Sequence, residues 1–185
     1  MLFDTPVYFL FLVFVVFVYW RLPHRGQNVF LLVCSYFFYG WWDWRFLFLI
    51  GASTLVDFFV AIRINSESRS SRRKFYLIIS LMINFGFLGF FKYFNFFIDS
   101  FSRVAAIFGP LDRLGPYLTI ILPAGISFYT FQAVAYVVDV YSGKLPPTRN
   151  IVDYALFISL FPHLVAGPIQ RPSHLLPQVQ KARNF

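Results

Sequence analysis

Apolar runs long enough to cross a lipid bilayer follow one another along this chain, separated by short segments that carry most of its charges. A helix needs about 20 mostly apolar residues to cross the roughly 30 Å hydrocarbon core. By this measure, residues 1–185 form a single transmembrane region with about six spans, near residues 4–21, 27–41, 44–62, 75–98, 118–140 and 151–166. The second span is short and the fifth is interrupted.

Composition agrees with this division, since 58% of the residues are hydrophobic and the mean hydropathy is +0.64. The predicted fold class is therefore an all-α polytopic transmembrane helical bundle with kinked or re-entrant segments. Asp4 stands where a cleavable signal peptide would have basic residues, so the first apolar run is expected to be a retained span. Cys34 is the only cysteine, which excludes a cysteine-based metal cage, and no metal site is predicted.

The formal net charge of +8 could indicate nucleic-acid binding in a soluble domain. Here the charges lie between apolar runs, without a nucleic-acid-binding signature, so the expected partner is the lipid bilayer and not nucleic acid. Cytoplasmic loops of membrane proteins are enriched in Lys and Arg. The most basic segment, 63–74, is therefore predicted to be cytoplasmic, which places the N-terminus outside.

Two polar residues interrupt the fourth span, Asn84 and Lys92. Lys92 stands among bulky aromatic residues, and two interpretations remain open for it. Near a helix end, a lysine can extend its ammonium group to the membrane interface. Alternatively, Lys92 is a buried cation that faces a polar cavity.

Polar residues in the fifth span recur at helical spacing. Offsets of four, three, four and three residues separate the members of one stripe: Gly125, Tyr129, Gln132, Tyr136 and Asp139. Lipid cannot satisfy an amide, phenols and a carboxylate, so this stripe is predicted to face protein or water. Its members either line a substrate-facing cavity or make hydrogen bonds within the bundle. Pro123 and Gly125 weaken the helix near its start, and Asp139 lies close to the cytoplasmic end.

The sixth span begins with Asn150 and Asp153, which are typical of a helix N-cap and its capping acid. It is then broken by Pro162, and again by Gly167 and Pro168, so we expect the chain to bend or re-enter here. His163 lies inside this bend. It is a candidate cavity-lining residue, with a structural hydrogen bond to the backbone as the alternative.

Several motifs together resemble the membrane-bound O-acyltransferase family, and in particular its bacterial alginate O-acetyltransferase branch. The motifs occur in family order: SYFFYGWWDWRFLFLI, GFFKYFNFFIDS, LPAGISFYTFQ, YVVDVYSGK, and LFPHLVAGPIQRP followed by LLPQ. The similarity covers nearly the whole chain. It corresponds to the N-terminal part of these longer proteins.

This resemblance implies a multi-pass enzyme of the bacterial inner membrane that transfers an acyl group, acetyl in this branch, to hydroxyls of an exported polysaccharide such as alginate. The donor would be acetyl-CoA or another acetyl carrier, and the partners would be the C-terminal part of the enzyme and periplasmic polysaccharide-acetylation proteins. The family's catalytic histidine lies in a later membrane segment. A histidine suits acyl transfer because its near-neutral pKa lets it accept and return a proton. No catalytic residue is therefore expected within residues 1–185, which we expect to be inactive alone.

A second class of function remains open at this point, because broken helices with polar stripes also occur in transporters. The chain could belong to a membrane transporter or to an assembly subunit with a similar bundle. An inverted repeat would favour transport, and the sequence shows none.

Overall fold

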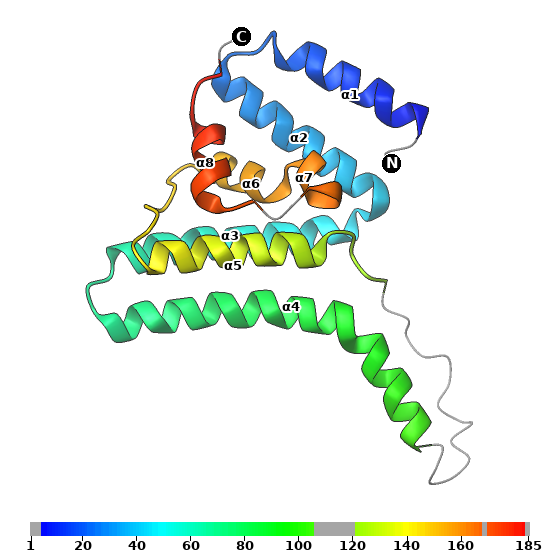
Figure 1. The fold of residues 1–185 in the computed structure, drawn as a ribbon, viewed down its shortest axis with the longest axis vertical. Coiled ribbons are helices and arrows are strands. Elements are labelled where there is room, and N and C mark those ends of the chain that lie inside the picture. The colour runs from blue at the N-terminus through cyan, green and yellow to red at the C-terminus, as the bar shows by residue number, and fades with distance from the viewer. Residues whose placement is uncertain (1–4, 106–120, 168–169, 184–185) are drawn as a thin grey trace.

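The computed structural model describes residues 5–105, 121–167 and 170–183, and these residues form helices without strands (Figure 1). The helices are α1 (Pro6–Tyr19), α2 (His24–Asp43), α3 (Arg45–Ser66), α4 (Ser70–Ala105), α5 (Ile126–Tyr141), α6 (Ile151–Ser159), α7 (Phe161–Ala166) and α8 (Pro172–Gln180). The predicted all-α fold class is confirmed. By length and composition, two of these helices could cross a membrane: α3, and α4 over Ser70–Ile98.

The helix starts follow local sequence signals. Asn150 caps α6 because its Oδ1 accepts the Val152 N–H at 2.9 Å. Pro6 opens α1, where its missing N–H leaves no intrahelical bond unmade. Glu67, between α3 and α4, accepts the backbone N–H of Arg69 at 3.1 Å. This hydrogen bond and the nearby Arg72 guanidinium lower the pKa of the Glu67 carboxyl.

Helices α3, α4 and α5 lie side by side and pack against one another (Figure 1). The shorter helices α6, α7 and α8 lie between this layer and α2, and α1 packs on the far side of α2. The main core is formed where these groups meet, by Ile50, Ala61, Ile64, Ala133, Tyr136, Val137, Tyr154, Leu156 and Phe157. By contrast, α1 exposes most of its apolar side chains and buries only Val15. Exposed apolar helix faces of this kind are typical of a membrane protein.

The bundle has two chemically different ends. At what we call the basic end, Arg73 donates to the Tyr141 carbonyl at 2.8 Å, and Arg183 donates to the Tyr19 hydroxyl at 2.8 Å. The opposite end contains the turn between α2 and α3. Around this turn, the side chains of Trp41, Trp42 and Trp44 are exposed.

Helices lie within each of the expected spans, but several boundaries differ. The second helix runs to Asp43 and is longer than 27–41. The fifth helix begins only at Ile126; residues 121–125 are not helical, and residues 118–120 lie outside the described chain. The basic segment 63–74 is mostly helical, because α3 continues to Ser66 and α4 begins at Ser70.

The expected span 151–166 is two short helices. Helix α6 contains 9 residues and is roughly 14 Å long, less than half the hydrocarbon thickness. The start of α6 and the end of α8 both lie at the basic end. Asn28 of α2 donates from Nδ2 to Asp153 Oδ1 and to the Val179 carbonyl, both at 2.9 Å. Helices α6 to α8 therefore enter the bundle from the basic end and return to it. We call α6, α7 and α8 together the re-entrant unit.

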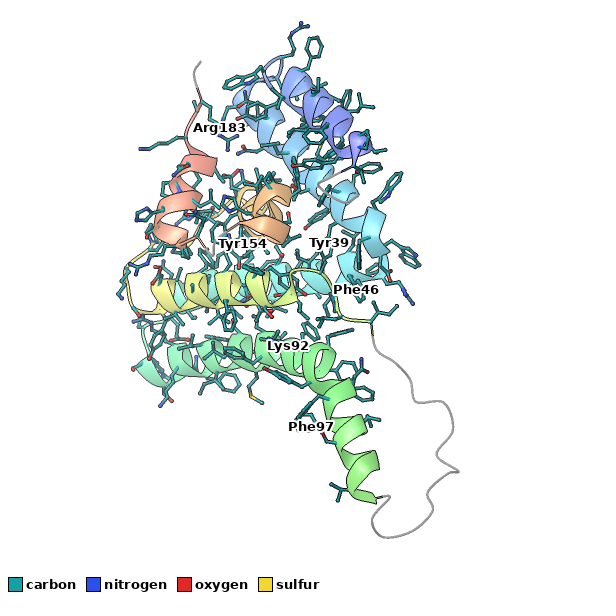
Figure 2. The ribbon with its side chains drawn as sticks, turned by 45° about the vertical axis from the view of Figure 1, so that its right-hand side comes forward. Tyr39, Phe46, Lys92, Phe97, Tyr154 and Arg183 are labelled. Carbon is teal, nitrogen blue, oxygen red and sulfur yellow. The ribbon has the colours of Figure 1, made fainter. Side chains whose placement is uncertain are left out.

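Helix α4 contains 36 residues, and Figures 1 and 2 show that it bends near Lys92. Gly86 and Gly89 precede the bend, and glycines are a common cause of helix kinks. Lys92 itself is exposed, with Nζ 5.6 Å from the centre of the Tyr93 ring. The alternative of a buried Lys92 is therefore wrong.

Candidate functional site

The two helix breaks that the sequence predicts meet inside the bundle. Gly125 precedes α5 with φ 72°, a left-handed conformation that glycine adopts readily. A Cβ atom at this position would lie 2.4 Å from the Leu164 carbonyl oxygen of α7. Glycine thus allows the start of α5 to approach the backbone of the re-entrant unit. Pro123 lies in the non-helical segment before this contact.

Side chains of neighbouring helices satisfy the backbone groups that the break between α6 and α7 sets free. In a continuous helix, the Phe161 N–H would donate to the Phe157 carbonyl. Instead, the Phe161 N–H donates to Ser35 Oγ at 3.2 Å, and Gln132 Nε2 donates to the Phe157 carbonyl at 2.8 Å. Pro162 provides no N–H at all. Ser35 of α2 and Gln132 of α5 therefore stabilise the break.

The polar stripe of α5 faces the interior along most of its length. Tyr129, Gln132 and Tyr136 have 1%, 6% and 0% of their surface exposed. The Tyr136 hydroxyl accepts the Thr148 N–H at 3.0 Å. Asp139 is half-buried, and it lines a surface depression of about 310 Å³ together with Lys144 and Arg171. The structure thus brings three stripe residues together inside the bundle and leaves Asp139 at its edge.

Two buried phenols have no hydrogen-bond partner among the described residues, those of Tyr129 and Tyr154. Tyr154 is on α6, with its ring centre 4.5 Å from that of Tyr136, and it is fully buried. Figure 2 shows Tyr154 and Tyr39 between the helical layer and α2; the Tyr39 hydroxyl donates to the Ala124 carbonyl at 2.9 Å. Buried hydroxyls without partners are uncommon. Each can donate a hydrogen bond to a carbonyl or hydroxyl oxygen. Tyr154 could not be predicted as part of the site, because a tyrosine in an apolar run does not reveal its neighbours.

His163 is half-buried on α7, and its Nδ1 has no hydrogen-bond partner among the described residues. A backbone hydrogen bond from Nδ1, one form of the alternative to a cavity-lining role, is therefore not seen in the part of the chain that the structure describes. Gly167 lies directly against the ring, since a Cβ there would be 2.4 Å from Nδ1. Pro162 is exposed, and Pro168 lies outside the described residues.

A second group of buried polar residues joins α3 to α4. Asp57 is fully buried; its Oδ1 accepts from Ser80 Oγ at 2.5 Å and from Asn84 Nδ2 at 3.0 Å. Asn84 also accepts from Ser53 Oγ at 2.7 Å. Of these residues, only Asn84 was singled out from the sequence. The spacing of four residues within each pair, Ser53 with Asp57 and Ser80 with Asn84, was a signal for two facing polar patches.

A polar pocket of about 440 Å³ opens at the basic end, between α2 and the re-entrant unit. It is lined by His24, Arg25, Asn28, Val29, Asn150, Val152, Asp153 and Gln180. Asn28 is buried, and its Oδ1 has no partner among the described residues. The pocket therefore offers both acceptors and cationic donors to a polar ligand. Within the described part of the chain, no three His, Cys, Asp or Glu side chains are grouped so that they could hold a metal ion.

Comparison with known proteins relates the chain to O-acetylases and an O-acetyltransferase. It is 40% identical over 182 residues to the probable alginate O-acetylase AlgI of Azotobacter vinelandii, which covers 96% of this chain and 36% of that protein. It is 39% identical over 184 residues to the probable alginate O-acetylase AlgI of Pseudomonas aeruginosa, and this match covers 96% of this chain and 34% of that protein. It is 33% identical over 214 residues to the peptidoglycan O-acetyltransferase of Helicobacter pylori, and this match covers 100% of this chain and 40% of that protein.

The polytopic helical fold and these relatives together define a class of membrane protein, the membrane-bound acyltransferases. The chain belongs to the membrane-bound O-acyltransferase family, in the branch of the alginate O-acetylases. It spans about a third of the length of the curated alginate O-acetylases that it matches. No family model and no solved structure matches it.

Proposed function

We propose that the chain forms part of a bacterial membrane O-acetyltransferase that transfers acetyl groups to hydroxyls of an exported polysaccharide such as alginate. One observation carries this proposal, the identity of 33–40% to O-acetylases over 96% or more of the chain. The same relatives include an enzyme named for peptidoglycan. Transfer to a polysaccharide hydroxyl is the chemistry that these names share.

Residues 1–185 would supply one wall of the reaction chamber and not the proton-transfer group. The buried phenols of Tyr129 and Tyr154 support this role, because they present hydrogen-bond donors without a partner among the described residues. Such donors can orient a carbonyl or hydroxyl oxygen. The catalytic histidine that the family resemblance implies would come from another part of the enzyme, so the isolated chain would be inactive.

The acetyl donor, acetyl-CoA or another acetyl carrier, would approach from the basic end. The polar pocket there combines the Arg25 guanidinium with the Asp153 carboxylate and with Asn28 Oδ1, which has no partner among the described residues. This mixture suits a ligand that has both anionic groups and hydrogen-bond donors.

The basic end would face the cytoplasm of the bacterial inner membrane, with the N-terminus outside. The distribution of cations supports this orientation: Arg73 and Arg183 lie at the basic end, whereas Arg45 at the opposite end is paired with Asp43 at 2.6 Å. Periplasmic proteins that acetylate polysaccharides would then meet the opposite end.

A chimera tests the proposed function. In the Pseudomonas aeruginosa enzyme, the region that matches this chain is replaced by residues 1–185, and the chimera is produced in a strain that lacks its own alginate O-acetylase. We expect acetyl groups to return to the secreted alginate, measured by NMR, whereas residues 1–185 alone restore none. A chimera that reaches the membrane in normal amounts and remains monodisperse in detergent, yet leaves alginate unacetylated, would contradict the proposal.

A further inference from the structure

The part of α4 beyond its bend leaves the bundle. We call residues 92–105 the α4 arm. In the first part of α4, Ser80, Asn84 and Leu88 are buried against α3 and α5. After Leu88, none of the described side chains of α4 is buried. The arm therefore needs a different environment to cover its apolar residues.

Among the described side chains of this region, the exposed apolar ones lie on one side of the helix. Phe96, Phe97 and Val104 have 62%, 65% and 55% of their surface exposed, and Phe90 and Tyr93 are exposed as well. At about 100° per residue, all five fall within an arc of roughly 120°. Lys92 lies outside this arc. One apolar face beside a polar one is typical of a helix that lies in a membrane interface.

The bend lies at the level of the exposed tryptophans. Phe91, next to Lys92, packs edge-on against Phe46 with ring centres 6.1 Å apart. Phe46 follows Trp44 by two residues in the first turn of α3. Exposed tryptophans mark the membrane–water interface in helical membrane proteins. The α4 arm thus begins at the depth where the hydrocarbon core ends.

The direction of the arm agrees with this depth. Helix α4 is roughly 54 Å long, whereas the hydrocarbon core is about 30 Å thick. Beyond the bend, the arm turns across the direction shared by the first part of α4, α3 and α5 (Figure 1). Phe97 is on the concave side of the bend, which faces back towards the first part of α4 (Figure 2).

We infer that the α4 arm is an interfacial helix that lies flat on the membrane surface at the end opposite the basic end. The lipid bilayer covers its apolar face, because the stripe with Phe97 and Val104 inserts into the boundary between headgroups and acyl chains. Lys92 remains at headgroup level. This inference does not depend on the acetyltransferase activity, because it rests on the depth of the bend, the direction of the arm and the placement of its apolar residues.

Spin labels can measure the depth of the arm. Cys34 is replaced by alanine, and single cysteines are introduced at Lys92, Phe97 and Val104 of the protein in vesicles of phosphatidylethanolamine and phosphatidylglycerol. Accessibility to oxygen, which partitions into the bilayer, is compared with accessibility to a water-soluble nickel chelate. Val16, exposed on α1, and Ser142, exposed in the loop after α5, give the reference values for lipid and water.

We expect Phe97 and Val104 to give the same shallow membrane depth, with high oxygen accessibility. The label at Lys92 should be several-fold more accessible to the nickel chelate. Nickel accessibility at Phe97 and Val104 equal to that at Ser142 would overturn the inference, because the arm would then extend into water. A progressive increase in depth from Phe97 to Val104, or exclusion of both reagents by protein, would overturn it as well.

Discussion

The Asp57 carboxylate is buried inside an apolar bundle, where it accepts hydrogen bonds from a neighbouring helix. Ser80 and Asn84 of α4 donate to it, and Asn84 in turn accepts from Ser53. Removing one partner from a buried polar group costs more than the bond itself contributes, because the remaining group stays buried and unsatisfied. This cluster therefore fixes the register of α4 against α3.

Asn84→Leu should lower the free energy of unfolding by roughly 2–4 kcal/mol, since it removes donors from the buried Asp57 carboxylate. The double variant Asp57→Leu with Asn84→Leu should lose less than the sum of the two single variants, because no carboxylate remains unsatisfied. Unfolding in mixed micelles with increasing dodecyl sulfate measures both. Additive losses would show that the two residues act independently.

Gly125 combines a left-handed backbone with a close contact, so Gly125→Ala should destabilise the bundle by about 1–3 kcal/mol. Gly51→Ala on α3 is the matched control. No atom lies within 4 Å of a Cβ there, and alanine in a helix is favoured by roughly 0.5–1 kcal/mol. The readout is the fraction of monodisperse protein after heating in detergent. Equal thermal stability of the two variants would contradict the assigned role of Gly125.

At the scale of helices, α5 and the re-entrant unit depend on each other. The break after Ser159 frees a carbonyl and an N–H, and Gln132 and Ser35 satisfy them. The period of 3.6 residues predicted that Tyr129, Gln132 and Tyr136 share a face, and Pro162 predicted the break. Helical periodicity and the position of a proline are local properties, so both can be read from the sequence.

The partners of these residues could not be predicted in the same way. Gln132 bonds to a carbonyl 25 residues away, and Asn28 bonds to Asp153 across 125 residues. Such pairs depend on how the helices are arranged, and one sequence gives no information on this. The bend of α4 contains no proline, and no bend was predicted within the expected span 75–98.

Gln132→Leu should lower the free energy of unfolding by about 1–3 kcal/mol, because the Phe157 carbonyl would remain buried without its donor. Gln178→Leu on α8 is the control, since this glutamine is exposed and its change should stay within roughly 0.5 kcal/mol. Both are measured by dodecyl sulfate unfolding. A loss at Gln132 no larger than that at Gln178 would mean that the break does not depend on the amide.

If the polar stripe is also part of the reaction chamber, Gln132→Leu and Asp139→Leu should each reduce acetyl transfer by the complete enzyme.

For the whole molecule, the re-entrant unit determines on which side of the membrane α8 lies. Five parts of the chain lie at the basic end: the turn before α2, the turn between α3 and α4, the loop after α5, and both ends of the re-entrant unit. Gln180 Nε2, for example, donates to Thr148 Oγ1 at 2.9 Å. If α6 to α8 crossed the bilayer instead, α8 would lie on the other side of the membrane.

Labelling of single cysteines in spheroplasts distinguishes these two topologies. In a Cys34→Ala background, Ser142→Cys and Gln178→Cys both occupy exposed positions, and Trp42→Cys marks the opposite end. A membrane-impermeant maleimide should label Trp42→Cys in intact spheroplasts, and Ser142→Cys and Gln178→Cys only after the membrane is opened. Labelling of Gln178→Cys together with Trp42→Cys would show that α6 to α8 cross the membrane. The contact between Asn28 and Val179 requires the first result, because Asn28 and Ser142 both belong to the basic end.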